Sequence, residues 1–188
     1  MQYITNASIY LVDVLFSLAL YVVLLRFWMQ WVRADFRNEL GQFVITITNP
    51  LVMPLRKIVP SIRTIDSATL LLAYIIALLK IAALLTLTYG FSPVALFPGV
   101  LITALGILLQ STIYLFMAAI FIGIVASWVA PHSYHPILMV VRSIGEPILT
   151  PARRVIPPIA GVDLSPILVF LFLNLCLILV AEPLIAFG

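Results

Sequence analysis

The stretch NPLVMPLRKIVP (residues 49–60) recurs 97 residues further along the chain as EPILTPARRVIP (residues 146–157). Both copies keep three prolines and an adjacent pair of basic residues, and an aspartate follows each copy at the same distance. The matching residues are Pro50, Pro54, Arg56, Lys57, Pro60 and Asp66 in the first copy, and Pro147, Pro151, Arg153, Arg154, Pro157 and Asp163 in the second. Because no gap is needed to align them, we predict a tandem duplication with repeats at residues 1–97 and 98–188.

Each copy of this stretch lies between two long apolar segments. The chain has 188 residues, of which 64% are hydrophobic and only 9% are charged, whereas a soluble domain is about 25% charged. The apolar runs cover residues 7–32, 67–89, 100–130 and 165–187, and each is long enough to cross a bilayer, which takes roughly 20 residues. We therefore predict an all-α membrane protein with four transmembrane helices, two in each repeat.

The distribution of basic residues predicts the orientation of these spans. Outside the apolar runs, Lys and Arg occur only in the two long connections within the repeats, residues 33–66 and 131–164. The connection between the repeats, GFSPVALFPG at residues 90–99, carries no charge. Because cytoplasmic loops are enriched in Lys and Arg, we expect a bacterial inner-membrane protein with both long connections in the cytoplasm and both termini in the periplasm. The two repeats then cross the membrane in the same direction, as parallel repeats.

The first half of each long connection is predicted to be an amphipathic helix. Apolar residues recur at helical spacing at Leu40, Phe43, Val44 and Ile47 in the first connection, and at Ile137, Leu138, Val140, Val141 and Ile144 in the second. These segments are too short and too polar to cross the membrane. We expect them to lie in its cytoplasmic interface.

The second half of each long connection is predicted to be a proline-bracketed basic elbow. Pro54 and Pro151 suit the first turn of a short helix, where a missing N–H is not needed, and the last proline of each copy is expected to end that helix. The basic pair could contact lipid phosphates or an acidic protein surface; alternatively, it only enforces the topology. Asp66 and Asp163 are expected to cap the next span, although Ser165 is an equally good cap in the second repeat.

Three features together resemble the YggT family, which is called YlmG in Gram-positive bacteria. They are the LLRFWMQW stretch (residues 24–31), the duplicated P-x-x-x-P-x-R-K/R-x-x-P elbow, and the Ile65-Asp66 and Val162-Asp163 pairs. The resemblance covers essentially the whole chain, and the two copies are similar to the proteobacterial members. It implies a link to osmotic tolerance and potassium homeostasis, while chloroplast relatives are linked to cytochrome assembly and nucleoid distribution. It implies no enzymatic activity.

Four polar residues within the apolar runs are predicted to lie at a similar depth, namely Asp13, Lys80, Gln110 and Glu182. Charged groups within a span cost roughly 2.5–3.5 kcal/mol at the bilayer centre and usually have partners. Helical rise places Lys80 about 21 Å and Asp13 about 28 Å from the cytoplasmic ends of their spans. We hypothesise an intramembrane polar cluster. The alternative is that Asp13 and Glu182 lie in the outer interface and that the long Lys80 side chain reaches toward it.

Near the expected cytoplasmic ends of the spans, Arg26, Trp28, Trp31 and Trp128 are predicted to be interface anchors. Arg26 lies about 9 Å deep by helical rise. We expect its side chain to extend to the interface beside Trp28 and Trp31. The alternative is an ion pair with an acidic residue of a loop.

The remaining polar and small residues predict no catalytic site. Ala119, Gly123 and Ser127 form a small-residue stripe that is expected to pack helices within the chain, although it could also serve a dimer. His132 and His135 are expected to be solvated loop residues, and the single cysteine, Cys176, excludes an internal disulfide. The sequence contains no nucleotide-binding loop, nucleophile–base pair or haem-attachment motif, so neither an enzyme nor a cofactor is predicted. Nothing in it supports nucleic-acid binding.

Two functions are compatible with these patterns. The first is a non-enzymatic inner-membrane scaffold or assembly factor that binds membrane lipids and another membrane protein, with a homo-oligomer left open. The second is a component of an ion channel or transport system for potassium, as the family resemblance implies. The spans hold few polar residues and no filter-like run of glycine and hydroxyl residues, which argues against an autonomous pore. We therefore favour the scaffold.

Overall fold

The computed structural model describes residues 2–61, 65–90, 98–129, 134–157 and 163–187. The first repeat contributes α1 (Gln2–Trp31), α2 (Glu39–Ile58) and α3 (Ser67–Tyr89). The second contributes α4 (Pro98–Val129), α5 (Pro136–Val155), α6 (Ser165–Cys176), a π-helical turn η2 (Leu177–Ala181) and α7 (Glu182–Ala186). The predicted boundary between residues 97 and 98 stays a prediction, because residues 91–97 lie outside the described ranges.

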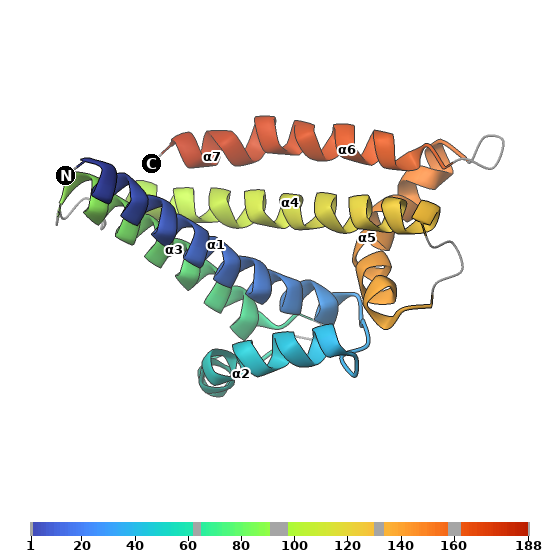
Figure 1. Ribbon diagram of the computed structural model, residues 1–188, viewed down its shortest axis with the longest axis horizontal. Coiled ribbons are helices and arrows are strands. Elements are labelled where there is room, and N and C mark those ends of the chain that lie inside the picture. The colour runs from blue at the N-terminus through green and yellow to red at the C-terminus, as the bar shows by residue number, and fades with distance from the viewer. Residues whose placement is uncertain (1, 62–64, 91–97, 130–133, 158–162, 188) are drawn as a thin grey trace.

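The prediction of an all-α fold with four spanning helices is confirmed. The described residues contain four helices that are long and apolar enough to cross a membrane: Tyr3–Trp31, Ser67–Tyr89, Pro98–Val129 and Ser165–Ala186. Both termini lie at one end of the bundle, while α5 lies at the opposite end, and α2 follows the far end of α1 (Figure 1). The spans α1 and α4 run in the same direction, as expected for parallel repeats.

The bundle is held together by three apolar clusters. Helices α1 and α3 pack against each other more extensively than any other pair, and α4 contacts both of them as well as α5 and α7. The largest cluster joins Met29 of α1 to Phe116 and Ile120 of α4 and Ile144 of α5. Residues of both repeats therefore share one core.

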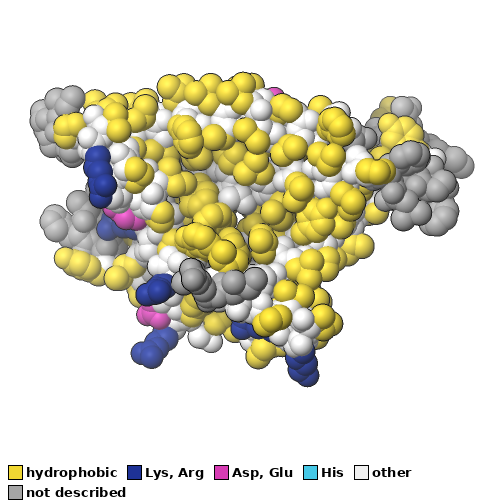
Figure 2. All heavy atoms as spheres, turned by 180° about the vertical axis from the view of Figure 1, so that it is seen from behind, with side chains coloured by type: hydrophobic (Ala, Val, Ile, Leu, Met, Phe, Trp, Pro, Cys, Tyr) yellow, Lys and Arg dark blue, Asp and Glu magenta, His cyan; other side chains and the backbone are white. Residues whose placement is uncertain are grey.

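The outer surface of the spans is apolar as well. Leu11, Leu15 and Leu18 of α1 and Leu171 and Phe172 of α6 are all more than half exposed. Figure 2 shows hydrophobic side chains spread over the spans, with the Lys, Arg, Asp and Glu side chains of this face gathered at its margins. Such a surface is unfavourable in water and suits lipid acyl chains as the solvent.

The prediction that Pro54 and Pro151 begin a separate short helix is wrong. Helix α2 continues from Glu39 to Ile58 with Pro50 and Pro54 inside it, and α5 continues through Pro147 and Pro151. A proline in a helix interior removes one hydrogen bond and pushes on the preceding turn, so the helix bends instead of ending. Figure 1 shows both helices changing direction along their length.

Two other expectations for these connections, the helix ends and the amphipathic character, agree with the structure. Helix α2 ends at Ile58 and α5 at Val155, two residues before the last proline of each copy. Each helix is amphipathic and buries one face, which includes Val44 and Val52 in α2 and Val140, Ile144 and Leu149 in α5. The bent helices therefore cover the ends of the spans and bring their basic pairs close to the aspartates that begin the next span.

Candidate functional site

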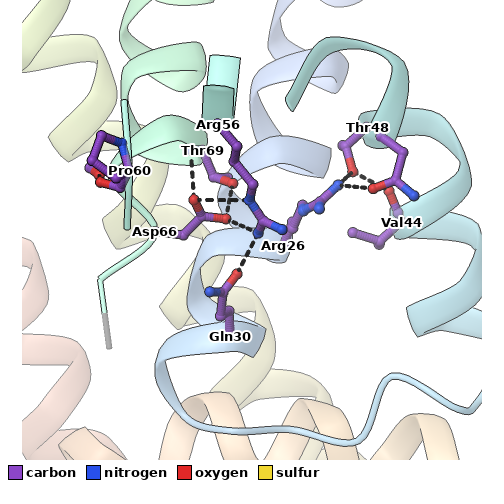
Figure 3. Close-up of polar contacts among 10 residues, drawn as sticks. Arg26, Gln30, Val44, Thr48, Arg56, Pro60, Asp66 and Thr69 are labelled. Carbon is purple, nitrogen blue, oxygen red and sulfur yellow. Dashed lines mark hydrogen bonds and ion pairs between the residues drawn. The ribbon is translucent and has the colours of Figure 1, made fainter. Parts of the chain in front are cut away.

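The basic pair of the first repeat is divided between two roles. Arg56 forms an ion pair with Asp66 through its Nη2 atom, and its Nε donates a longer hydrogen bond of 3.4 Å to Asp66 Oδ1. Arg56 Nη2 also donates to Gln30 Oε1 of α1 at 3.3 Å. Asp66 in turn caps α3, because its carboxylate accepts hydrogen bonds from the backbone N–H and the hydroxyl of Thr69. This Arg56 clasp ties α1, α2 and α3 together (Figure 3).

The second repeat contains a similar clasp at the matching positions. Arg153 Nε donates to Asp163 Oδ2 at 2.8 Å, and Arg153 Nη1 pairs with Glu146 Oε1 at 2.7 Å. Asp163 Oδ1 accepts from the backbone N–H of Ser165, at the start of α6, at 2.9 Å. Of the two capping candidates in this repeat, it is therefore the Asp163 side chain that bonds the helix N-terminus.

Both clasps lower the pKa of their aspartate. Burial favours the neutral form of Asp66, but hydrogen bonds from Arg56 and Thr69 outweigh burial and hold its pKa below the ordinary value. Burial opposes ionisation of Asp163 as well, and hydrogen bonds from Ser165 and Arg153 lower its pKa overall. The pKa of Arg153 is raised, chiefly by its hydrogen bond to Asp163. Asp66 and Asp163 therefore stay ionised at neutral pH.

The second residue of each basic pair lies at the surface of the fold. Lys57 and Arg154 are exposed, and no ion pair to either of them is formed within the described ranges. The sequence prediction treated both residues of a pair as available to lipid or to a partner. In the structure Arg56 and Arg153 also hold the connection to the next span, although their side chains stay about one-third exposed, at 34% and 37%.

Arg26 does not extend to the interface as predicted. Its side chain is buried, with the residue only 5% exposed. Its Nη1 donates to Thr48 Oγ1 at 2.6 Å and to Asn49 Oδ1 at 3.0 Å, so it joins α1 to α2 (Figure 3). Among the residues that the structure describes, the alternative, an ion pair with an acidic loop residue, is not formed either. A buried guanidinium needs several acceptors, and two neutral groups of α2 supply them.

Of the four residues of the predicted intramembrane cluster, only Asp13 and Lys80 contact each other, and the hydroxyl of Ser17 joins them. Lys80 Nζ lies 2.9 Å from Asp13 Oδ1 and donates to Ser17 Oγ at 2.8 Å. Gln110 is half-buried and Glu182 is exposed, and within the described ranges neither forms an ion pair or hydrogen bond to Lys80 or Asp13. The pair ties α1 to α3 within the first repeat.

The three predicted tryptophan anchors have different surroundings. Trp31 is 43% exposed and Trp128 is 78% exposed, so both present their rings to the outside of the bundle. Trp28 instead packs edge-to-face on Phe116 of α4, with ring centroids 4.6 Å apart. Its prediction as an interface anchor is therefore wrong, since its ring lies between the two repeats.

Two cavities lie beside the elbow of the second repeat. One, of about 650 Å³, lies between Trp31 and Val32 of α1 and the part of α5 that includes Glu146 and Arg154. The other, of about 490 Å³, lies between α4, α5 and the start of α6 and is lined by Gly123 and Arg153 among others. Among the described residues no group of three or more His, Cys, Asp or Glu side chains could hold a metal ion.

Several residues of these contacts were not found by reasoning from the sequence. Ser17 follows Asp13 by one helical turn, a spacing that places the two side chains on one face. Gln30 and Thr48 have no such local signal, because each partners an arginine more than 20 residues away. His135 is exposed, as expected for a solvated loop residue, and its ring nitrogen in addition accepts from the backbone N–H of Ile137 and caps α5. His132 lies outside the described residues.

The fold and these contacts define a class: a helical membrane protein of two tandem repeats, each with two spans joined by a bent amphipathic helix. The chain belongs to the CCB3/YggT family, which matches residues 5–87 and again residues 102–184. Both bounds of the second match lie 97 residues after those of the first. This agrees with the shift between the two sequence copies and confirms both the duplication and the resemblance.

Similar chains extend over almost the full length. The Pseudomonas aeruginosa protein PA0392 is 42% identical over 97% of this chain and 92% of its own length. The YggT protein of Escherichia coli K12 is 37% identical over 97% of this chain and 94% of its own. A protein encoded in the proC 3′ region of Vibrio alginolyticus is 38% identical over 90% of each. No solved structure matches this chain.

Proposed function

We propose that this chain is a non-enzymatic scaffold or assembly factor of the bacterial inner membrane. In this proposal α2 and α5 face the cytoplasm and hold a partner membrane protein. The observation that carries the proposal is the division of each basic pair, with one residue in the clasp and the other, Lys57 or Arg154, exposed. The same arrangement occurs twice in one molecule, so the surface is presented in two copies.

The geometry of the elbows supports this use. Each clasp fixes the end of α2 or α5 against the next span, so the adjacent exposed cation is held at a defined place. A basic residue at an anionic surface contributes about 1 kcal/mol, and rigid placement lowers the entropy lost on binding. The cavity of about 650 Å³ that includes Arg154 adds a concave surface at the junction of the two repeats.

The charged groups inside the bundle favour a scaffold over a pore. Arg26 is bonded to Thr48 and Asn49, and Lys80 to Asp13 and Ser17. These groups stabilise contacts between helices, whereas a conduction path requires polar groups that face a water-filled passage. The link to osmotic tolerance that the family resemblance implies is exerted through the partner in this proposal.

The test is co-purification of the tagged chain from its own membranes in mild detergent, followed by quantitative mass spectrometry. The variant carries Lys57→Gln and Arg154→Gln, which leave both clasps in place. The matched control carries Arg33→Gln and Arg37→Gln, because these residues are also exposed but lie between α1 and α2, outside the elbows. We expect a stoichiometric partner that is lost from the elbow variant and kept by the control. The proposal fails if the elbow variant keeps every partner of the unmodified chain.

A further inference from the structure

The cavity of about 490 Å³ between α4, α5 and the start of α6 has mostly apolar walls that include several polar and charged side chains. Helix α4 contributes Gly123 and Ser127, and α5 contributes Arg142, Glu146 and Arg153, with Asp163 beyond the end of α5. Apolar side chains such as Ile124 and Leu149 line the rest of it. Neither the clasps nor the basic elbows explain an open space at this position.

In the first repeat the matching place is occupied by a cation. The duplication pairs Gly123 with Arg26 and Glu146 with Asn49. The Arg26 guanidinium is buried there and donates to Thr48 and Asn49 of α2 (Figure 3). The same fold therefore shows, within one chain, how a positively charged group is held between the first span of a repeat and its bent helix.

Gly123 leaves the second copy of this place open. A Cβ atom built on Gly123 would meet no atom within 4 Å. By contrast, a Cβ on Gly145 would lie 3.1 Å from Ile120 Cγ1, so Gly145 is needed where α5 packs against α4. Close helix packing thus explains the glycine at position 145 but not the glycine at position 123. The missing side chain at Gly123 leaves a space the size of a side chain beside Glu146.

The charges around this space differ from those of the first repeat in two ways. A carboxylate, Glu146, stands where the first repeat has the neutral Asn49, and Arg142 stands where it has Ile45. Glu146 Oε1 already accepts from Arg153 and Thr150, while Oε2 receives no hydrogen bond from the described residues. The second repeat therefore offers an acceptor for a cation and, beside it, an exposed guanidinium for an anion.

The depth of the cavity matches that of lipid head groups. Gly123 lies six residues before the end of α4 at Val129, or about 9 Å along the helix axis. The bent helix α5 forms the adjoining wall, and the apolar lining continues toward the surface of the spans. A lipid head group that carries both charges would find both kinds of partner here, and its acyl chains can follow the apolar wall.

We propose that this cavity binds the head group of a zwitterionic phospholipid with a primary ammonium, such as phosphatidylethanolamine. The ammonium occupies the place that the Arg26 guanidinium fills in the first repeat and donates to Glu146. The phosphate lies beside Arg142, with Arg153 at the same wall. A phospholipid with only negative charge fits less well, because Glu146 and Asp163 repel it. The site is independent of the proposed scaffold function, which rests on Lys57 and Arg154.

The test is native mass spectrometry of the full-length chain in detergent, mixed with equal amounts of phosphatidylethanolamine and phosphatidylglycerol of the same acyl composition. We expect the unmodified chain to retain phosphatidylethanolamine in preference to phosphatidylglycerol. Gly123→Arg copies the first repeat and fills the cavity from within, so the retained phosphatidylethanolamine should fall about tenfold, the loss of one charge-assisted hydrogen bond. Gly123→Ala adds only a Cβ into open space and should retain the lipid.

A second variant keeps the test valid if the arginine disturbs folding. Glu146→Gln removes the proposed acceptor carboxylate, while Asp163 continues to hold Arg153, and it should abolish the preference between the two lipids. Thermal unfolding and size-exclusion profiles of each variant identify those that fold. Equal retention of both lipids by the unmodified chain would refute the proposal. So would an unchanged lipid preference in a folded Gly123→Arg or Glu146→Gln variant.

Discussion

At the scale of single residues, the two clasps are not equivalent. The Asp66 side chain is fully buried beside a one-third exposed Arg56, whereas Asp163 and Arg153 are both about one-third exposed, at 31% and 37%. A buried charge that loses its partner costs several kcal/mol, whereas an exposed pair contributes little. The first clasp should therefore contribute more to the stability of its repeat than the second.

This difference predicts unequal effects of the same substitution. Asp66→Asn should lower the free energy of unfolding by about 2–3 kcal/mol, and Asp163→Asn by about 1 kcal/mol or less. Asparagine keeps a carbonyl oxygen that can cap the helix, so the change isolates the loss of charge. Unfolding of the purified chain by sodium dodecyl sulfate in mixed micelles measures both values. Equal losses would show that burial does not set the strength of the clasps.

The lowered pKa of Asp66 predicts acid destabilisation with a defined sign. A depressed pKa in the folded state stabilises the protein at every pH above the unfolded value, which is about 3.9 for aspartate. This stability is lost as the pH falls through the lowered value of the folded state. The midpoint of thermal unfolding should therefore fall as the pH is lowered from about 4 through the lowered pKa of the folded state. Asp66→Asn should flatten this dependence, and an unchanged slope in that variant would assign the effect to other carboxylates.

At the scale of helices, alanine substitutions at two glycines of α4, Gly106 and Gly123, are expected to have opposite effects on stability. A Cβ on Gly106 would lie 2.9 Å from the backbone nitrogen of Ile185, so α4 and α7 can approach closely only because Gly106 has no side chain. Gly106→Ala should force the helices apart and cost about 1–3 kcal/mol. Gly123→Ala meets open space and should be neutral or slightly stabilising, because alanine favours the helix. Both variants can be compared in the same unfolding assay, and a neutral Gly106→Ala would refute the close packing.

The helices also show which structural features can be predicted from local sequence patterns and which cannot. Apolar runs and the shift between the copies predict the spans and the repeats, because both depend on residues close in sequence or on direct identity. The fate of Pro54 could not be predicted in this way. Whether a proline ends a helix or bends it depends on the packing of the residues beyond it, and here Arg56 lies just beyond Pro54 and is anchored by Asp66 and Gln30.

The contacts of Arg26 could not be predicted from local sequence patterns either. Its expected direction is wrong, since its acceptors Thr48 and Asn49 come from α2, more than 20 residues away in the sequence. The duplication does carry a signal at these positions, because Arg26 aligns with Gly123 and Asn49 with Glu146. A change from arginine to glycine between otherwise similar repeats indicates a position whose side chain has a particular role in one copy.

At the scale of the whole molecule, both repeats should place their bent helices on one side of the membrane. The termini lie together at one end of the bundle, and α1 and α4 run in the same direction (Figure 1). We expect the basic connections on the cytoplasmic side. The exposed positions Asn6, Lys57 and Arg154 can each be replaced by cysteine in a Cys176→Ser background, which gives one reporter on the terminal side and two on the other.

A membrane-impermeant maleimide then distinguishes the sides. In intact spheroplasts it should label Asn6→Cys, and it should label Lys57→Cys and Arg154→Cys only after the membrane is opened. Labelling of all three after opening is the control for reactivity. Labelling of Lys57→Cys and Arg154→Cys under different conditions would mean that the repeats cross the membrane in opposite directions, and would contradict the parallel bundle. If both elbows react in intact spheroplasts, the bundle is parallel but inverted, and a partner of the scaffold has to be sought on the periplasmic side.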